Sequence, residues 1–178
     1  MSIFTNPASG AAGAANAYVS AILELVGDRD PLEILGSTVE WCRVVVEGLN
    51  DRQLRTPESR GKWSVVEVMQ HLADSELVWG YRLRKVLAED RPRLTGFDQD
   101  LWARRLGYAV ADATSALEMF SALRRANLAL LSKAAPEDLD RAGVHEERGE
   151  ESVRHMMRLY AGHDLAHRRQ LDRIVAGL

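Results

Sequence analysis

The sequence predicts an all-α protein, a four-helix bundle with an extra short helix at its N-terminus. Three observations lead to this prediction. In four long segments, apolar residues recur at alternating spacings of three and four, which places them on one face of an α-helix. Side chains that cap helices stand at the start of two of these segments. The alternation of apolar and polar residues that marks a half-buried strand is weak throughout.

Length and composition describe an ordinary globular domain. The 178 residues are enough for one domain with one core, and 46% hydrophobic residues exclude a disordered chain. A net charge of −3 argues against a nucleic-acid partner. The single Cys42 excludes a disulfide framework and fits a reducing compartment. Because no apolar run reaches 18 residues and Met1–Gly10 lacks Lys and Arg, we expect neither a membrane partner nor a secretory signal, and a cytoplasmic location.

We divide the chain at residue 30. Residues 1–29 are predicted to be an N-terminal extension with a short helix over Tyr18–Val26, and Gly27 suits the end of that helix. Residues 30–178 are predicted to form the bundle. The extension, or an exposed face of the first bundle helix, could support a homodimer.

The first bundle helix is predicted to begin at Asp30, which can cap it, with Pro31 in the first turn. Its apolar face consists of Leu32, Leu35, Val39, Cys42, Val46 and Leu49. Because Cys42 lies within this face, we interpret it as a small buried hydrophobic residue rather than a reactive thiol. Residues 50–63 are predicted to be a loop.

The later helices follow from similar signals. Ser64 and Glu67 form a capping-box pattern, S-x-x-E, which predicts a second long helix that ends near Ala88. A short helix over Phe97–Leu106 and a third long helix from about Asp112 to Lys133 come next. Residues 135–150 contain a proline and two glycines and are predicted to be a loop with a short extended turn. The fourth long helix is predicted over Glu151–Val175.

The apolar face of the fourth helix contains two histidines where the pattern requires apolar side chains. His163 and His167 are four residues apart, so both imidazoles lie on one face of the helix, one turn apart. That spacing suits two ligands of one metal ion, and a hydrogen-bonded pair in the core is the alternative. His71, at the edge of the second helix's apolar face, is the candidate third ligand. Three imidazoles leave coordination positions open for water or substrate. We expect His145 and His155 to be solvated.

Carboxylates are the natural partners of the second N–H of a ligating imidazole. Four are candidates for this role: Glu67, Asp74, Glu76 and Asp164. Glu76 falls within the apolar face of its helix, which is unusual for a carboxylate, and pairing with an arginine of a neighbouring helix is the simplest interpretation.

Two segments resemble sequence blocks of the DinB-like family. Residues 61–76 are similar to its W-S-x-x-E-x-x-x-H-L-x-D-x-E block, and residues 161–171 to its H-x-x-x-H-x-x-Q block, in the family's order and separation. The resemblance spans roughly residues 31–177 and implies a four-helix bundle that holds a divalent metal ion, zinc or nickel, through His71, His163 and His167. Relatives include bacillithiol transferases and a mycothiol-dependent maleylpyruvate isomerase.

The resemblance therefore implies a metal-dependent enzyme that acts on a small molecule. Its most specific form is a thiol-dependent S-transferase, in which the metal activates a low-molecular-weight thiol as co-substrate. Two alternatives stay open: a metal-dependent hydrolase, and a non-catalytic helical bundle of a stress response whose metal is structural or absent.

Overall fold

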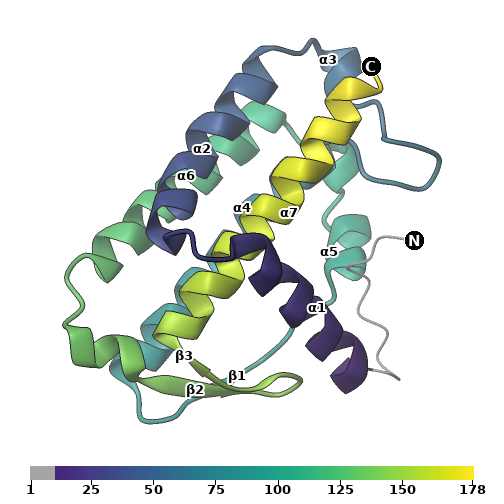
Figure 1. Ribbon diagram of the computed structural model, residues 1–178. Helices are drawn as coiled ribbons and strands as arrows, with labels where there is room; N and C mark the ends of the chain where they lie inside the picture. The colour runs from purple at the N-terminus through teal and green to yellow at the C-terminus, as the bar shows by residue number, and fades with distance from the viewer. Residues whose placement is uncertain (1–10) are drawn as a thin grey trace.

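The computed structural model confirms the mostly helical fold (Figure 1). The fold is described here for residues 11–178, with side chains from Ala17 onward. The four long helices that make up the bundle are α2 (Pro31–Glu47), α4 (Val65–Ala88), α6 (Ala113–Leu131) and α7 (Val153–Ala176). Among the pairs that pack together are α4 with α6, and α2 with α7.

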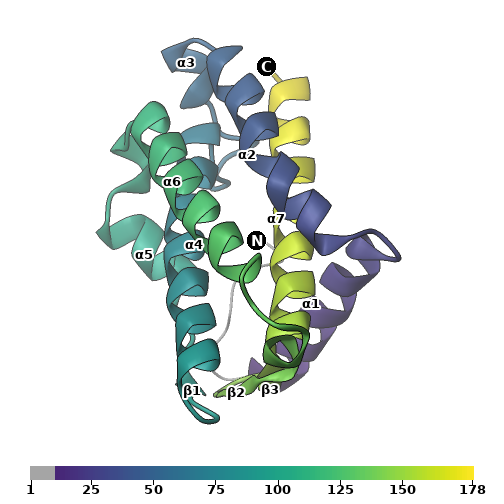
Figure 2. The same cartoon turned by 90° about the vertical axis from the view of Figure 1, so that its left-hand side faces the viewer.

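The remaining elements join or cover the ends of the bundle. Helix α1 (Ala11–Val26) packs against α7, as Figures 1 and 2 show from two sides. The shorter helical elements are α3 (Asp51–Leu54), α5 (Gln99–Arg105) and the 3₁₀ turns η1 (Tyr108–Val110) and η2 (Pro136–Asp140). A small sheet of β1 (Arg93–Leu94), β2 (Ala142–His145) and β3 (Gly149–Ser152) lies at one end of the bundle.

The predicted caps form in the structure. Asp30 Oδ1 accepts a hydrogen bond from the Leu32 N–H at 2.9 Å, and α2 begins directly after it. The Ser64 N–H donates to Glu67 Oε2 at 2.8 Å, which completes the capping box at the start of α4. These bonds satisfy backbone donors that have no partner inside the helix, so the sequence pattern located both helix starts correctly.

Three local features differ from the predictions. Helix α1 begins at Ala11 rather than at Tyr18. The predicted loop over residues 50–63 contains α3, whose own capping box of Asn50 and Gln53 was visible in the sequence. The extended turn is a β-hairpin of β2 and β3, joined by β1 in parallel to β2. Gly149 follows the turn with a φ of 81°, a conformation that costs glycine less than other residues.

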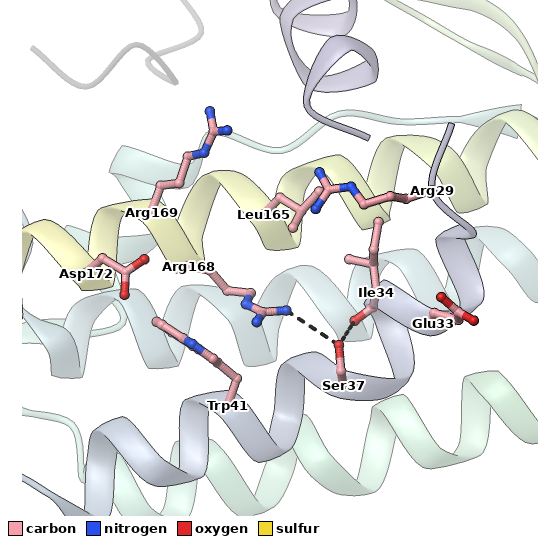
Figure 3. Close-up of a pocket in the computed structure, with 9 residues that line it drawn as sticks. All are labelled: Arg29, Glu33, Ile34, Ser37, Trp41, Leu165, Arg168, Arg169 and Asp172. Atoms are coloured by element: carbon pink, nitrogen blue, oxygen red, sulfur yellow. Dashed lines mark hydrogen bonds between the residues drawn. The ribbon is translucent and has the colours of Figure 1, made fainter. Parts of the chain in front are cut away.

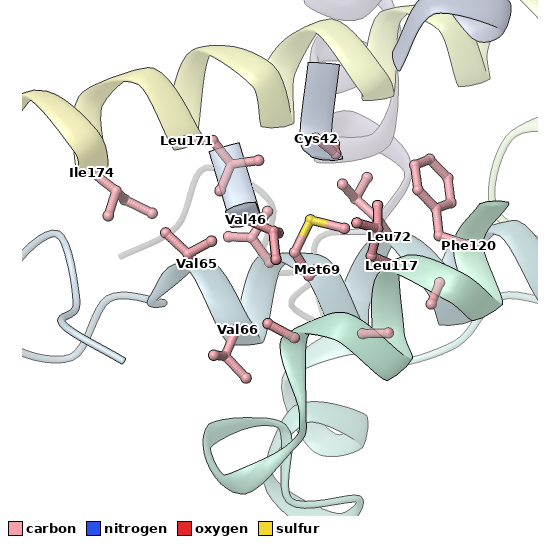
Figure 4. Packing of buried hydrophobic residues seen from close by; sticks show 14 residues of the cluster. Cys42, Val46, Val65, Val66, Met69, Leu72, Leu117, Phe120, Leu171 and Ile174 are labelled. Carbon is pink, nitrogen blue, oxygen red and sulfur yellow. The ribbon is translucent and has the colours of Figure 1, made fainter. Parts of the chain in front are cut away.

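One of the two hydrophobic clusters of the core surrounds Cys42, as Figure 4 shows. Cys42 is fully buried, and burial raises the pKa of its thiol to about 12. A thiol in such surroundings stays protonated and unreactive, which confirms the interpretation of Cys42 as a core residue. Figure 4 labels its neighbours, among them Val46, Met69, Leu72, Phe120 and Leu171.

Helices α1 and α7 meet closely at Gly162, the residue before His163. A β-carbon added at Gly162 would lie 2.5 Å from the backbone carbonyl oxygen of Ile22. We expect Gly162→Ala to lower the free energy of unfolding by about 1–3 kcal/mol, because α1 must move away from α7. Gly36→Ala is the control, since no atom lies within 4 Å of a β-carbon there. Chemical denaturation of both variants measures the difference, and equal stabilities would contradict the close packing.

No helix in the described part of the chain combines the length and apolar character needed to cross a membrane.

Candidate metal centre

Three histidines from two helices converge in the interior of the bundle. His71 comes from α4, and His163 and His167 come from successive turns of α7. One ring nitrogen from each lies within 4.8 Å of the others. His71 Nε2 and His163 Nε2 are 3.1 Å apart. The tertiary structure thus brings together the three residues that the sequence singled out.

The three imidazoles are held in the neutral form. Burial lowers the pKa of His71 and of His163 well below the usual range, and the other rings add to this shift. Burial likewise lowers the pKa of His167 to about 4. A neutral imidazole has one nitrogen with a free electron pair, which is the form that binds metal ions. Two nitrogens 3.1 Å apart also match the spacing of two ligands at about 2.1 Å from one ion.

Gln170 determines which nitrogen of His167 carries the proton. Its Oε1 lies 2.9 Å from His167 Nδ1, and because a carbonyl oxygen only accepts, Nδ1 must donate. The electron pair of His167 is therefore on Nε2. The sequence-based prediction named only carboxylates as partners of the imidazoles and did not include Gln170. Its position in the sequence, one helical turn after His167, could have identified it as a partner of that imidazole.

Aromatic rings enclose His71. The ring centroid of Trp63 lies 5.0 Å from that of His71, and Phe97 lies at 6.5 Å. Trp102 of α5 packs against Phe97 at 4.7 Å. His71 Nδ1 makes no hydrogen bond among the described residues, and the Ser75 hydroxyl lies 3.3 Å from Nε2, so ring packing and Ser75 together orient this imidazole. Sequence reasoning did not assign Phe97 or Trp102 to the site.

Access to the centre lies on the side of His163. His71 and His167 are each 1% exposed, whereas His163 is partly exposed. The ring of Tyr160, one turn earlier on α7, lies 6.3 Å from the His163 ring and is also partly exposed. The side of the cluster nearest to solvent is therefore that of Tyr160 and His163.

The four candidate carboxylates are engaged elsewhere, and none hydrogen-bonds an imidazole. Glu67 serves the capping box of α4. Asp74 accepts from the Tyr108 hydroxyl at 2.5 Å and from the Gln70 amide. Glu76 and Asp164 both bind the guanidinium of a single buried arginine.

That arginine is Arg124 of α6, which confirms the pairing interpretation for Glu76. Arg124 Nη2 donates to Glu76 Oε2 at 2.9 Å, and Nη1 donates to Asp164 Oδ2 at 2.6 Å. Nη1 also donates to the Leu35 carbonyl of α2 at 2.8 Å. Asn127 completes the cluster by donating to Glu76 Oε1. The cluster links all four bundle helices, and one of its members, Asp164, directly follows His163 in the sequence.

The expectation that His145 is solvated is wrong. His145 is the last residue of β2 and is buried, at 1% exposed. Burial, with the positive charges of Arg148 and Arg82, lowers its pKa to about 4. The surrounding sequence is polar and charged, so composition suggested solvent exposure, but the folded chain buries this side chain. His155 is partly buried rather than fully solvated.

A separate surface hollow of about 340 Å³ lies between α2 and α7 (Figure 3). None of the three histidines lines it. The guanidinium of Arg168 lies 5.1 Å from the ring of Trp41 and donates to Ser37 Oγ. The lining side chains carry both positive and negative charges, so the charge of the hollow does not favour either an anionic or a cationic ligand. It is lined by Arg29, Glu33, Ile34, Ser37, Trp41, Leu165, Arg168, Arg169 and Asp172.

Comparison with known proteins identifies the family. Residues 42–171 match the model of the DinB superfamily. A relative from Oceanobacillus iheyensis is 33% identical over 119 residues, which cover 67% of this chain and 69% of the relative. The chain belongs to the DinB superfamily. All three histidines lie within the matched region of the DinB model, so the resemblance seen in the two sequence blocks is confirmed.

One further relative and one solved structure match most of this chain. One from Geobacillus kaustophilus is 29% identical over 169 residues, covering 94% of this chain and 88% of its own. The solved structure of YfiT from Bacillus subtilis superposes with a TM-score of 0.74 at 26% identity, covering 82% of this chain and 86% of YfiT. YfiT is described provisionally as a metal-dependent hydrolase with an unusual four-helix bundle topology, and the other two relatives are likewise provisionally named metal-dependent hydrolases.

Proposed function

We propose that this protein is a metal-dependent enzyme in which His71, His163 and His167 hold one divalent ion, zinc or nickel. The observation that carries the proposal is the convergence of three neutral imidazoles whose ring nitrogens lie within 4.8 Å of one another. One of the three, His163, is partly exposed. Such a donor set suits a catalytic ion, since three ligands leave positions open for water or substrate. The provisional names of the relatives support metal dependence.

A divalent ion bound there would act as a Lewis acid that lowers the pKa of a thiol or of water. The chain contributes three things to that chemistry. Neutral histidines add no charge, so the ion keeps its electrophilic character. Gln170 fixes the tautomer of His167. Trp63 and Phe97 shield His71 from water and strengthen electrostatic interactions inside the site.

The more specific proposal is a thiol S-transferase that uses a low-molecular-weight thiol. The four candidate carboxylates are each bound by another group, so none of the four is placed to act as a general base for water. A thiol, with a pKa near 8.5, needs less help to ionise than water does. In the reaction, the thiol sulfur bonds to an electrophilic carbon, the leaving group departs with its electron pair, and the thiol proton passes to solvent.

A metal-dependent hydrolase is the second candidate, and the names of the relatives favour it. In that case the nucleophile is water. An assay that offers both reactions to the same preparation separates the two candidates.

The test begins with protein purified without a metal-affinity tag. We expect near-stoichiometric zinc or nickel by mass spectrometry, thiol consumption with 1-chloro-2,4-dinitrobenzene, and loss of both after dialysis against a chelator. Re-addition of the metal should restore the activity. Hydrolysis of p-nitrophenyl acetate without thiol conjugation would favour the hydrolase. A folded protein that contains no metal and takes up neither zinc nor nickel would contradict both proposals and leave a non-catalytic bundle.

A further inference from the structure

Two arginines are almost fully buried in the described part of the chain, and their surroundings differ. Arg124, 2% exposed, binds two carboxylates. Arg82, 5% exposed, binds only neutral oxygens: its Nη1 donates to the Tyr160 hydroxyl at 3.2 Å and its Nη2 donates to the Thr95 carbonyl. Its Nε is buried and has no hydrogen-bond partner among the described residues. Within that part of the chain, no carboxylate lies within ion-pair distance of Arg82.

The remaining residues of the chain cannot supply the missing negative charge either. The first acidic residue in the sequence is Glu24, which lies within the described part. Residues 1–16 therefore contain no carboxylate that could pair with Arg82. A buried cation without an anion is costly, and proteins seldom retain one without a functional reason.

Arg82 lies close to the candidate metal centre through Tyr160. The Tyr160 hydroxyl contacts Arg82, and its ring lies 6.3 Å from the His163 ring, measured between centroids. Trp79, one turn before Arg82 on α4, stacks on the Tyr160 ring at 4.7 Å and 23°. This stacking fixes the ring, so the hydroxyl points at the guanidinium. Arg82 thus contacts Tyr160, which lies beside His163, and both of these residues are partly exposed.

The groups around Arg82 add a further positive charge. Arg148 lies near it, since the charges of both arginines act on Tyr160 and on His145. Glu151 is the buried carboxylate here, and Arg148 binds it, with Nη2 at 3.1 Å from Oε2. The charge of Arg82 also acts on Glu151 and helps to lower its pKa, but the two form no ion pair. His145 Nε2 is buried without a hydrogen-bond partner among the described residues.

One more carboxylate acts on this region from the surface. Glu146 is exposed, and its Oε1 accepts from the Gly96 N–H at 2.6 Å. Its negative charge acts to raise the pKa of His145, but it forms no ion pair with Arg82. Of the two arginines in this region, Arg148 is bound by Glu151, whereas Arg82 has no carboxylate at ion-pair distance. The two guanidiniums share one buried carboxylate, which leaves room for one further negative charge.

We propose that Arg82 and the Tyr160 hydroxyl form a subsite for a carboxylate group of the small molecule that reacts at the three histidines. This inference rests on the proposed function, because it places the reacting atom at the histidines and the carboxylate next to Tyr160. A guanidinium and a hydroxyl together offer the fork of donors that a carboxylate accepts. The carboxylate belongs either to the thiol or to its electrophilic partner, and the experiment distinguishes them.

The first arm compares two thiols of the same shape by calorimetry on zinc-loaded protein. 3-Mercaptopropionate is expected to bind about tenfold or more tightly than 3-mercaptopropionamide, as a charge-assisted hydrogen bond implies. Arg82→Met should reduce this preference to about twofold or less. Arg91→Met is the matched control, because Arg91 is exposed and paired with Glu150, and it should leave the preference unchanged. Tyr160→Phe, which removes only the hydroxyl, should weaken the preference several-fold even if Arg82→Met folds poorly.

The second arm uses metal-free protein and needs no reaction. Propionate is expected to raise the melting temperature of the wild-type chain more than propionamide at the same ionic strength, and Arg82→Met should abolish the difference. Without any ligand, Arg82→Met should be as stable as the wild type or more so, because it removes a buried unpaired charge. A purely structural Arg82 would instead make this variant clearly less stable.

A third arm assigns the carboxylate to one reactant. If chloroacetate, and not chloroacetamide, shows the Arg82-dependent preference with a neutral thiol, the carboxylate is on the electrophile. Equal binding of acid and amide in every arm, with the thiol still binding at the zinc ion, would overturn the subsite while the proposed function stands. Stabilisation by propionate without binding of any thiol would support the subsite and contradict thiol transfer.

Discussion

Arg124→Met is expected to lower the free energy of unfolding by about 3–5 kcal/mol. The guanidinium neutralises Glu76 and Asp164, which are both buried, and it also holds the Leu35 carbonyl. Without it, two carboxylates stay in the interior of the bundle with no cation. Burial raises the pKa of Glu76, and Arg124 opposes this shift. Loss of Arg124 should therefore raise the pKa of Glu76 further. Urea denaturation followed by circular dichroism measures the change.

Two controls separate the buried ion cluster from a general effect of losing an arginine. Arg125→Met removes the neighbouring, exposed arginine of α6 and should change stability by less than about 0.5 kcal/mol. The triple variant Arg124→Met, Glu76→Gln, Asp164→Asn removes the stranded charges and should recover a large part of the loss. If Arg124→Met proved no less stable than Arg125→Met, the cluster would not be what holds the four helices together.

The second large effect concerns the proposed metal ligands. We expect His71→Ala, His163→Ala and His167→Ala each to weaken zinc binding by more than about 100-fold, since each removes one of three ligands. Gln170→Ala should have a smaller effect, about 10–100-fold, because Gln170 only orients His167. His155→Ala is the matched control on the same helix and should bind zinc normally. Competition with a zinc chelator measures the affinities.

Stability of the same variants tests whether the ion is catalytic or structural. A catalytic ion predicts that His163→Ala stays folded, with a melting temperature close to that of the zinc-loaded wild type, but lacks activity. A structural ion predicts a large loss of melting temperature in every ligand variant. Normal zinc affinity in any of the three histidine variants would remove that residue from the centre.

Much of this architecture is encoded locally and could be predicted. The caps at Asp30 and Ser64 depend on side chains that bond backbone groups two or three residues away, so the sequence alone locates them. His163 and His167 stood out because each breaks an apolar pattern at a helical spacing. The pairing of Glu76 followed from the same reasoning, because a carboxylate on an apolar face needs a cation. The short helix α3 was missed even though its capping box is local.

The sequence by itself determined the four long helices, the caps at Asp30 and Ser64, the bundle and the three histidines, since these follow from periodicity and from contacts within a few residues. Only the tertiary structure decided which side chains meet across the chain. Arg82 and Tyr160 are 78 residues apart, and no local pattern connects them. The burial of His145 depends on a three-stranded sheet whose first strand is two residues long. Strand pairing and charge burial arise from contacts between distant segments, so they emerge only when the chain folds.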